Sequence, residues 1–361
     1  STSTTTVIPL FQQKPLLICQ VMSPGYFARG LHRDTYINQE VPNATICDYT
    51  LLDLPLLPNG TYESVSYDFI SSAGHQLLFR VELENLDPFQ SLAVIQDPSF
   101  KRSVHMAQIS LEPSKICGLG YLKGLTILEG WATAPARKGY LNNIYNSFNQ
   151  ALVNHRLRQA DVRNFFAFQP NENVIRMKYV DYLSELNRIH ALSIVIILTI
   201  TDETMPQVMA SSSWDVTCLP QSNQTTMKEA VDAILQIPNP SLSYTLSITL
   251  RLDIFHGTFL PSKGTKQLDI ITTIGHESRS FSDMCEQELF HRDPTGSSII
   301  YINNDNCAFA SGIGRASLIT FDTPTTIRQK MYATYRRINY SRTSTHVVGW
   351  TVYNVTCGLA A

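Results

Sequence analysis

The chain has 361 residues, of which 43% are hydrophobic, and its formal net charge is −2 at pH 7. This length allows a large buried core in one or two domains. The charge is nearly balanced and shows no acidic or basic block, which argues against nucleic acid or an anionic membrane as a partner. The most apolar run, Ala191–Ile200, is about half as long as a membrane-spanning helix, so we expect no membrane segment.

Eight apolar runs predict strands. Several of them are apolar on both faces, as a parallel sheet covered by helices requires. In chain order these runs are Leu16–Met22, Thr45–Leu52, Gln76–Leu83, Gly124–Leu128, Arg163–Phe168, Leu192–Thr199, Tyr244–Leu252 and His346–Val352.

Amphipathic helices are predicted between the strands. One runs from Leu141 to Leu152, and another runs from Met227 to Leu235 before a proline-rich stop. A third begins with Thr323 as N-cap and Pro324 at the first helical position. Its inner stripe is predicted to consist of Ile327, Met331, Tyr335 and Ile338. The alternation of strands and helices favours a parallel barrel or a doubly wound sheet, and the pattern alone does not choose between them.

We expect a single domain over residues 1–361, because no repeat or linker marks a second one. The long gap between the seventh and eighth strands predicts an insertion over about residues 256–320. The Ser- and Thr-rich start is typical of a mature terminus, and residues 1–12 are predicted to be a flexible segment.

The cysteines and glycosylation sequons point to the secretory pathway. There are seven cysteines without a C-x-x-C pair, and the nine histidines lack zinc-site spacing, so we expect no metal and no cofactor. The odd number leaves at least one thiol free or paired between chains, and we expect Cys117, buried beside a core strand, to be free. Five N-x-S/T sequons in loop-like contexts favour secretion; they begin at Asn43, Asn59, Asn223, Asn339 and Asn354.

Several segments resemble, in order, the family-18 glycoside hydrolases, the chitinases and chitinase-like proteins. The segment LLICQVM at Leu16–Met22 resembles the family's first strand, and ICDYTLLDL at Ile46–Leu54 resembles its second. KGLTILEGW at Lys123–Trp131 falls where the family has D-G-L-D-I-D-W-E-Y, and VVGWTVY resembles its last strand, with Trp350 at the barrel-floor tryptophan. The resemblance implies an α/β fold, a (β/α)8 TIM barrel with a reduced insertion between strands 7 and 8.

The resemblance also implies disulfides. It pairs Cys19 with Cys47 on neighbouring strands and favours a bond between Cys285 and Cys357. The other cysteines, Cys218 and Cys307, stay open for pairing.

The same resemblance predicts that chitin hydrolysis is lost. Members of the family use a carboxylic acid as proton donor, while the N-acetyl group of the substrate acts as nucleophile. The three aspartate positions of the aligned segment carry Lys123, Thr126 and Leu128, and the glutamate position carries Gly130. Glu129 would point to the opposite face from Gly130, because side chains alternate along a strand. We therefore expect no enzyme activity on chitin.

Polar residues are expected at the mouth of the barrel, where the strands end and where such barrels keep their sites. The candidates for ligand binding are Glu82, Glu84, Glu129, Gln169, Asp202, Arg251 and Trp350, with Asp53 and Glu203 nearby. One interpretation is an acidic pocket for a polar or cationic ligand, with Trp350 as its apolar floor. The other is that the acids are exposed loop ends and Trp350 fills the core.

Three functions follow as hypotheses. The first is a secreted, extracellular, non-catalytic chitinase-like glycoprotein, a monomer that binds a glycan, another polar ligand or a protein partner. The second is a glycoside hydrolase with a relocated acidic site that uses a residue such as Glu82 or Glu129. The third is an interaction or inhibitor protein whose barrel is closed.

Overall fold

The structure, a computed structural model, describes residues 15–22, 44–56, 74–81, 83, 86, 88–122, 138–154, 157–169, 173–199, 214, 226–249, 252–261, 268–279, 300–304, 307–311, 317–340 and 346–353. Within these ranges, the side chains of residues 22, 53–56, 88, 138, 173–178, 252–321 and 340 are not described. No helix in the described part of the chain is long and apolar enough to cross a membrane.

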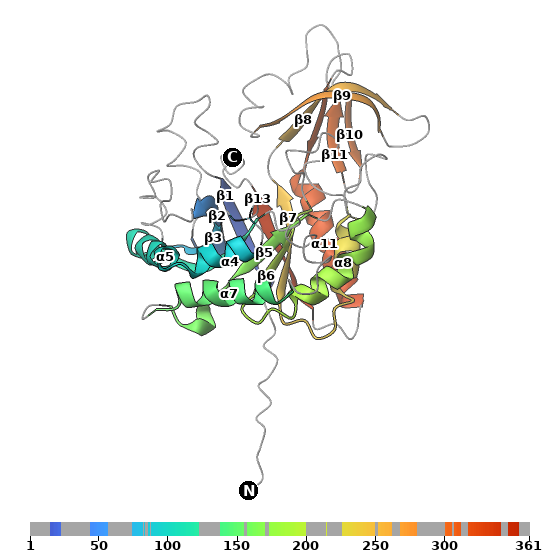
Figure 1. Cartoon of the computed structure of the whole chain (residues 1–361). Coiled ribbons are helices and arrows are strands. Elements are labelled where there is room, and N and C mark those ends of the chain that lie inside the picture. The colour runs from blue at the N-terminus through green and yellow to red at the C-terminus, as the bar shows by residue number, and fades with distance from the viewer. Residues whose placement is uncertain are drawn as a thin grey trace.

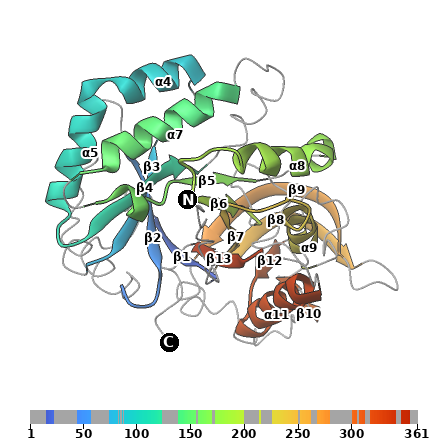
Figure 2. The same ribbon diagram turned by 90° about the horizontal axis from the view of Figure 1, so that it is seen from below.

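Eight parallel strands close into a barrel in the order β1-β13-β7-β6-β5-β4-β3-β2. The first and last strands close it, with Leu17 in register with Trp350. This closure selects the barrel over the doubly wound sheet and confirms the predicted TIM-barrel fold (Figure 2). The strands are β1 (Leu17–Met22), β2 (Tyr49–Leu56), β3 (Gln76–Val81), β4 (Lys115–Tyr121), β5 (Phe165–Phe168), β6 (Ile194–Ile197), β7 (Ser243–Thr249) and β13 (Val348–Tyr353).

The described helices lie outside the barrel strands, as seen from below in Figure 2. They are α4 (Pro88–Gln96), α5 (Pro98–Ser110), α7 (Lys138–Leu152), α8 (Asn173–Leu186), α9 (Met227–Ile234) and α11 (Pro324–Tyr340), with a 3-10 turn at Gln159–Asp161. α9 begins with a capping box, in which Thr226 and Glu229 bond each other's backbone. The predicted N-cap of α11 is confirmed, because Thr323 Oγ1 accepts a bond from Thr326 N at 3.1 Å.

The apolar residues form two layers separated by the barrel wall. The lumen cluster contains only residues on or beside the barrel strands, among them Ile18, Leu78, Phe165 and Ile196. The larger cluster contains the alternate strand residues together with residues of the surrounding helices, such as Phe148 and Leu183. Membership of a cluster therefore tells which face of a strand a side chain occupies.

The fourth barrel strand lies earlier in the chain than predicted. The predicted strand Gly124–Leu128 is outside the described residues, whereas β4 is Lys115–Tyr121. A Cβ on Gly120 would lie 1.9 Å from the carbonyl oxygen of Phe165 on β5, and one on Gly118 would lie 2.0 Å from that of Arg163. The glycines allow this close approach of β5, but they weaken the strand pattern in the sequence, which explains the wrong assignment.

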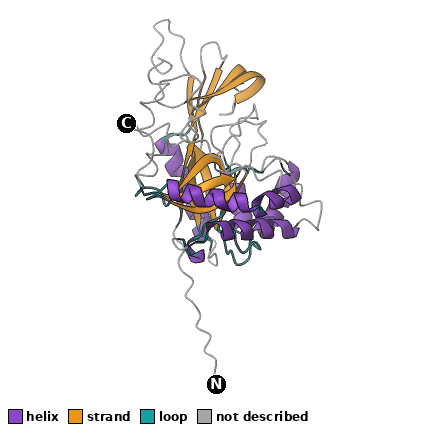
Figure 3. Ribbon diagram, turned by 60° about the vertical axis from the view of Figure 1, so that its left-hand side comes forward, coloured by secondary structure: helices purple, strands orange, loops and turns teal. Residues whose placement is uncertain are grey.

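A second sheet separates β7 from β13 in the chain. It contains β8 (Leu252–Pro261), β9 (Leu268–Arg279), β10 (Ile300–Asn304), β11 (Cys307–Ser311) and β12 (Ser317–Phe321), in the spatial order β10-β11-β12-β8-β9. β8 starts three residues after β7 ends, so this sheet begins at the C-terminal end of the barrel (Figures 1 and 3). The sheet corresponds to the predicted insertion.

Three of the four residues of the predicted inner stripe of α11 pack against the core: Ile327, Met331 and Ile338. Tyr335 does not, because it is 63% exposed. The most deeply buried side chains of the helix are polar ones that the prediction missed, Thr326, Lys330 and Thr334. Lys330 can be buried because it pairs with the buried Asp322 just before the helix.

Candidate functional site

The structure describes the side chains of two of the seven candidate ligand-binding residues, Gln169 and Trp350. Six residues of the predicted mouth lie outside the described residues: Glu82, Glu84, Glu129, Asp202, Glu203 and Arg251. For Asp53 only the backbone is described, as part of β2. The acidic mouth thus stays a prediction.

Gln169 lies at the predicted place. It directly follows β5, whose lumen-facing residues are Phe165 and Ala167, and alternation places the amide on the same face. The residue is 8% exposed, so it is buried at the C-terminal end of the barrel. This is the end where barrel enzymes and binding proteins keep their sites.

Trp350 lies on the other side of the barrel wall. It is in register with Leu246, and both belong to the cluster that faces the helices. Its ring therefore does not form an apolar floor in the lumen. The aromatic residue that β13 contributes to the lumen cluster is Tyr353, three residues later.

The expected role of Trp350 came from the family resemblance, which supplied an aromatic residue but not its orientation. Alternation along the strand places Thr351 and Tyr353 on one face and Trp350 on the other, but it does not tell which face is the inner one.

The described lumen wall is lined by hydroxyl and amide groups at several positions. Thr245 Oγ1 and Thr351 Oγ1 are 2.7 Å apart, between β7 and β13. Ser247 Oγ donates to the carbonyl oxygen of Ile197 at 3.2 Å and accepts from Thr199 N at 2.7 Å. Gln20 on β1 is also buried. These groups carry no net charge, and the three hydroxyls bond one another or the backbone.

The lumen face of β4 carries two glycines and an apolar side chain. Leu122, directly after β4, belongs to the lumen cluster, and by alternation Gly118 and Gly120 share its face. Leu119 and Tyr121 belong to the helix-facing cluster, which agrees with this assignment. Arg80 on β3 is in register with Gly120. Among the described side chains on the lumen face of the strands, none is a carboxylate.

The thiol of Cys117 forms no disulfide with a described residue and is buried, as predicted, and it lies within β4. Its Sγ donates to Oε1 of Gln76 at 2.7 Å. Burial raises the pKa of this thiol to about 11, although the nearby Lys115 opposes the shift. The thiol therefore stays protonated at neutral pH and is a poor nucleophile.

The disulfide between Cys19 and Cys47 is present, as the resemblance implied. The favoured pair Cys285 and Cys357 lies outside the described residues. Of the five sequon asparagines, the structure describes Asn339, which is exposed on the last turn of α11 rather than in a loop. Across the described ranges, no group of three or more histidine, cysteine or acidic residues could hold a metal ion.

Comparison with known proteins gives a match in fold. No family model matches the chain, and no curated protein matches its sequence. The structure is similar to a class V chitinase from Nicotiana tobaccum, at a TM-score of 0.57 and 11% identity over 95% of each chain. It is also similar to catalytic domain 2 of the Group II chitinase of Ostrinia furnacalis, at a TM-score of 0.60 and 15% identity over 96% of this chain and 91% of that chain.

A third similar structure is an immunomodulatory active chitinase from Trichuris suis, with a TM-score of 0.58 and 10% identity over 95% of this chain and 93% of that chain. At these identities the likeness shows a chitinase-type barrel fold and nothing finer.

Proposed function

We propose that this chain is a secreted, non-catalytic chitinase-like protein whose barrel binds a polar, uncharged ligand of the N-acetylglucosamine oligomer class. The observation that carries the proposal is the lumen face of β4, where Gly118, Gly120 and Leu122 take the positions nearest the barrel mouth. Hydrolysis by the substrate-assisted route needs a proton donor and orienting acids at this place.

The position of β4 changes the alignment with the chitinase motif but not its consequence. The Gly-Leu pair of D-G-L-D-I-D-W-E now falls on Gly118 and Leu119. The three aspartate positions then carry Cys117, Gly120 and Leu122, and the glutamate position carries Gly124. Neither this alignment nor the one centred on Lys123–Trp131 places a carboxylate at those positions.

The close packing of β4 against β5 supports the proposal that no acidic side chain occupies position 120. A Cβ there would lie 1.9 Å from the carbonyl oxygen of Phe165, which is backbone and cannot rotate away. An aspartate could enter only if β5 moved outward, against the packing of Phe166 and Phe168 on the helix-facing side.

The chemistry of the described lumen suits a neutral sugar. Its wall contains the internally bonded hydroxyls of Thr245, Ser247 and Thr351, together with the amides of Gln20 and Gln169 and the ring of Tyr353. Hydroxyl and amide groups of N-acetylglucosamine can pair with such donors and acceptors, and a sugar ring can pack on an aromatic side chain. Two of the similar chitinase structures hold oligomers of this sugar.

Secretion rests on the Cys19–Cys47 disulfide and on the exposed Asn339 sequon. Disulfides persist in oxidising compartments, and glycosylation of such a sequon takes place in the secretory pathway. Mass spectrometry of the protein from a secreting eukaryotic host is expected to find both modifications; an unmodified Asn339 with reduced thiols would contradict the assignment.

The test combines a hydrolysis assay with calorimetry on N-acetylglucosamine tetramer. We expect no release of shorter oligomers and a measurable heat of binding. Gln169→Ala should weaken binding by about two- to tenfold, because one hydrogen bond contributes about 0.5–1.5 kcal/mol. The matched control is Gln236→Ala, at an exposed glutamine that bonds the carbonyl oxygen of Asp232 and is expected to leave binding unchanged.

Three results would contradict the proposal. Turnover of the tetramer would favour a hydrolase with a relocated acid. Absence of heat would favour a closed barrel that acts through its outer surface. Equal effects of the two glutamine substitutions would place the sugar outside the lumen.

A further inference from the structure

α5 is an outer helix whose exposed face carries basic but no acidic side chains. Five of its side chains are exposed: Lys101, Arg102, His105, Met106 and Ile109. Their spacing places them on one side of the helix, opposite the buried Phe100, Val104 and Ala107. No acidic residue lies between Pro98 and Ser110. This outer face, called the α5 face below, lies on the side of the barrel away from α11 (Figures 1 and 2).

The cations of the α5 face have no counter-ion among the described residues, unlike several on other helices. Lys228 pairs with Asp232 at 3.0 Å, and Arg337 pairs with the same carboxylate at 2.6 Å. Arg188, just after α8, pairs with Glu185 at 2.9 Å. Asp97, the acid next to α5, caps the helix by accepting from Ser99 N at 2.7 Å. Lys101 and Arg102 are therefore exposed cations that no described acid neutralises.

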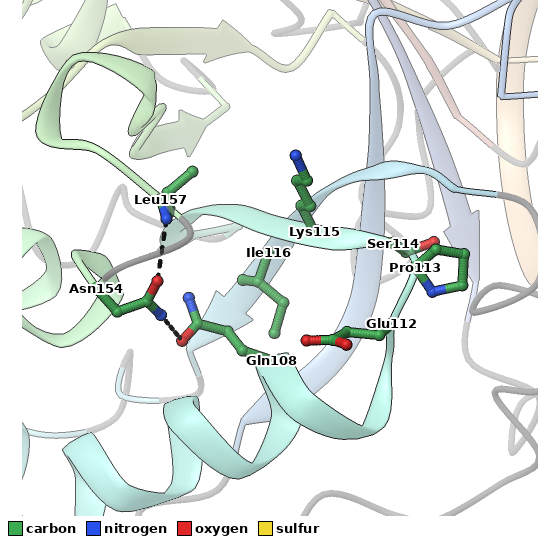
Figure 4. Close-up of a pocket in the computed structure, with 8 residues that line it drawn as sticks. All are labelled: Gln108, Glu112, Pro113, Ser114, Lys115, Ile116, Asn154 and Leu157. Atoms are coloured by element: carbon green, nitrogen blue, oxygen red, sulfur yellow. Dashed lines mark hydrogen bonds between the residues drawn. The ribbon is translucent and has the colours of Figure 1, made fainter.

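A pocket of about 430 Å³ lies at the C-terminal end of α5. It is lined by Gln108, Glu112, Pro113, Ser114, Lys115, Ile116, Asn154 and Leu157. Figure 4 shows Glu112 and Ile116 on one side of the start of β4 and Lys115 extending to the other. Because Lys115 and Ile116 begin β4, the pocket is at the opposite end of the barrel from Gln169.

The amide groups of the pocket are held by bonds within the protein. Asn154 Nδ2 donates to Oε1 of Gln108 at 2.8 Å, and Leu157 N donates to Oδ1 of Asn154 at 3.0 Å. Gln108 Nε2 donates to the carbonyl oxygen of Leu152 at 3.1 Å. Since these amides are satisfied, they form fixed walls, and Ile116, Pro113 and Leu157 provide apolar surface for an inserted side chain.

The cations and the pocket lie along one line of the helix. Lys101, His105 and Gln108 are spaced i, i+4 and i+7, so they follow one another along the same side of α5. The seven residues from Lys101 to Gln108 span about 10 Å, a distance that about three residues of an extended chain cover. One short segment can therefore reach the cations and the pocket together.

We propose that the α5 face and this pocket form a docking site for an acidic segment of a partner protein. One apolar side chain of that segment enters the pocket, and acidic residues about three positions away pair with Lys101 and Arg102. A protein segment is favoured over an anionic lipid surface because Met106 and Ile109 are the only large apolar side chains exposed on this helix, whereas the pocket accommodates a discrete side chain. The site is separate from the barrel lumen and does not depend on the proposed sugar binding.

The experiment measures fluorescence polarisation of the labelled peptide Ser-Leu-Gly-Ser-Glu-Asp-Glu-Ser with the full chain. We expect saturable binding that weakens with added salt. Replacing the three acids by their amides, or the leucine by serine, should each weaken it. In the protein, Arg102→Glu should weaken binding by about fivefold and the double change with Lys101→Glu by more, as is usual for interfacial charges. Both residues are exposed, so folding is not at risk.

The matched control is Arg328→Glu, the same change at an exposed arginine on α11. It should leave binding within about twofold, because it lies on another side of the barrel. An equal loss in the two arginine variants would mean that only net charge matters and would reject the site. Absence of peptide binding would reject it as well. Binding to phosphatidylserine vesicles through Arg102 without peptide binding would replace it by a lipid surface.

Discussion

At the level of single residues, two glycines determine how closely β4 packs against β5. Gly118 and Gly120 allow the backbone of β5 to approach β4 more closely than any side chain would permit. The same two residues leave the lumen face of β4 without functional groups. The same glycines therefore account for the close packing of the two strands and for the absence of a side chain at these two lumen positions.

Gly120→Ala is expected to destabilise the protein by about 3 kcal/mol, because its Cβ meets a backbone oxygen that cannot move without shifting β5. Denaturant unfolding followed by circular dichroism measures this change. Gly139→Ala in α7 is the matched control: no atom of the described residues lies within 4 Å of its added Cβ, and helix propensity makes it neutral or stabilising by up to about 1 kcal/mol. Equal stability of the two variants would contradict the proposed clash between a Cβ at position 120 and the carbonyl oxygen of Phe165.

Because His75 is buried, we expect the protein to lose stability in acid. The residue is buried, with Nδ1 at 3.0 Å from Thr50 Oγ1, and its Nε2 makes no hydrogen bond to a described residue. Burial lowers the pKa of His75 from the ordinary 6.5. The unfolded chain therefore binds a proton at a higher pH than the folded one does. This contribution to stability is complete above about pH 6.5 and is lost as the pH falls toward the lowered folded pKa.

Replacing this residue, as His75→Asn, should make the free energy of unfolding depend less on pH between about 7.5 and 5.5. The matched control is His190→Asn, at an exposed turn. Denaturation curves across this range measure the slope. An unchanged slope in His75→Asn would show that another group causes the acid dependence.

At the level of elements, α11 is anchored by a buried ion pair. Lys330 Nζ lies 2.6 Å from Asp322 Oδ1, and both side chains are 1% exposed. Thr326 Oγ1 also donates to Asp322 Oδ1, at 2.9 Å, while Oδ2 accepts no hydrogen bond from the described part of the chain. Because Asp322 directly follows β12, the pair ties the end of the inserted sheet to the helix that returns to the barrel.

Lys330→Met should destabilise the fold by about 3–5 kcal/mol, because it leaves the buried carboxylate without a cation. The double change Asp322→Asn with Lys330→Met removes both charges and keeps an acceptor for Thr326, so it should recover most of that loss. Unfolding free energies of the two variants and the parent chain provide the comparison. A double variant as unstable as Lys330→Met would show that the charges themselves are not the cause.

At the level of the whole molecule, the proposed binding sites lie at two ends of one barrel. The lumen near Gln169 and Tyr353 offers neutral polar groups for a sugar. The pocket beside α5 lies at the start of β4, and the adjoining helix carries cations that no described acid neutralises. Under the two proposals, one barrel holds a glycan at one end and a protein partner at its side, and the two experiments test these sites separately.

Local patterns in the sequence by themselves determine a large share of this protein. Seven of the eight predicted barrel strands overlap the observed ones, the helix predicted from Met227 to Leu235 matches α9, and the start of α11 follows from its predicted cap. The Cys19–Cys47 bond was also predicted correctly, and Cys117 is buried without a disulfide to any described residue, as predicted. These features depend on residues close together in the chain or on a family resemblance.

The tertiary structure decided what such patterns do not contain. Closure joins β1 to β13 from the two ends of the chain, and it determines that Tyr353, rather than Trp350, faces the lumen. The place of β4 depended on the backbone of β5 fitting against its glycines. The buried Lys330 depended on a carboxylate outside its own helix. In each case the deciding partner is a neighbour in space, and alternation or helical period specifies two faces without saying which one is inside.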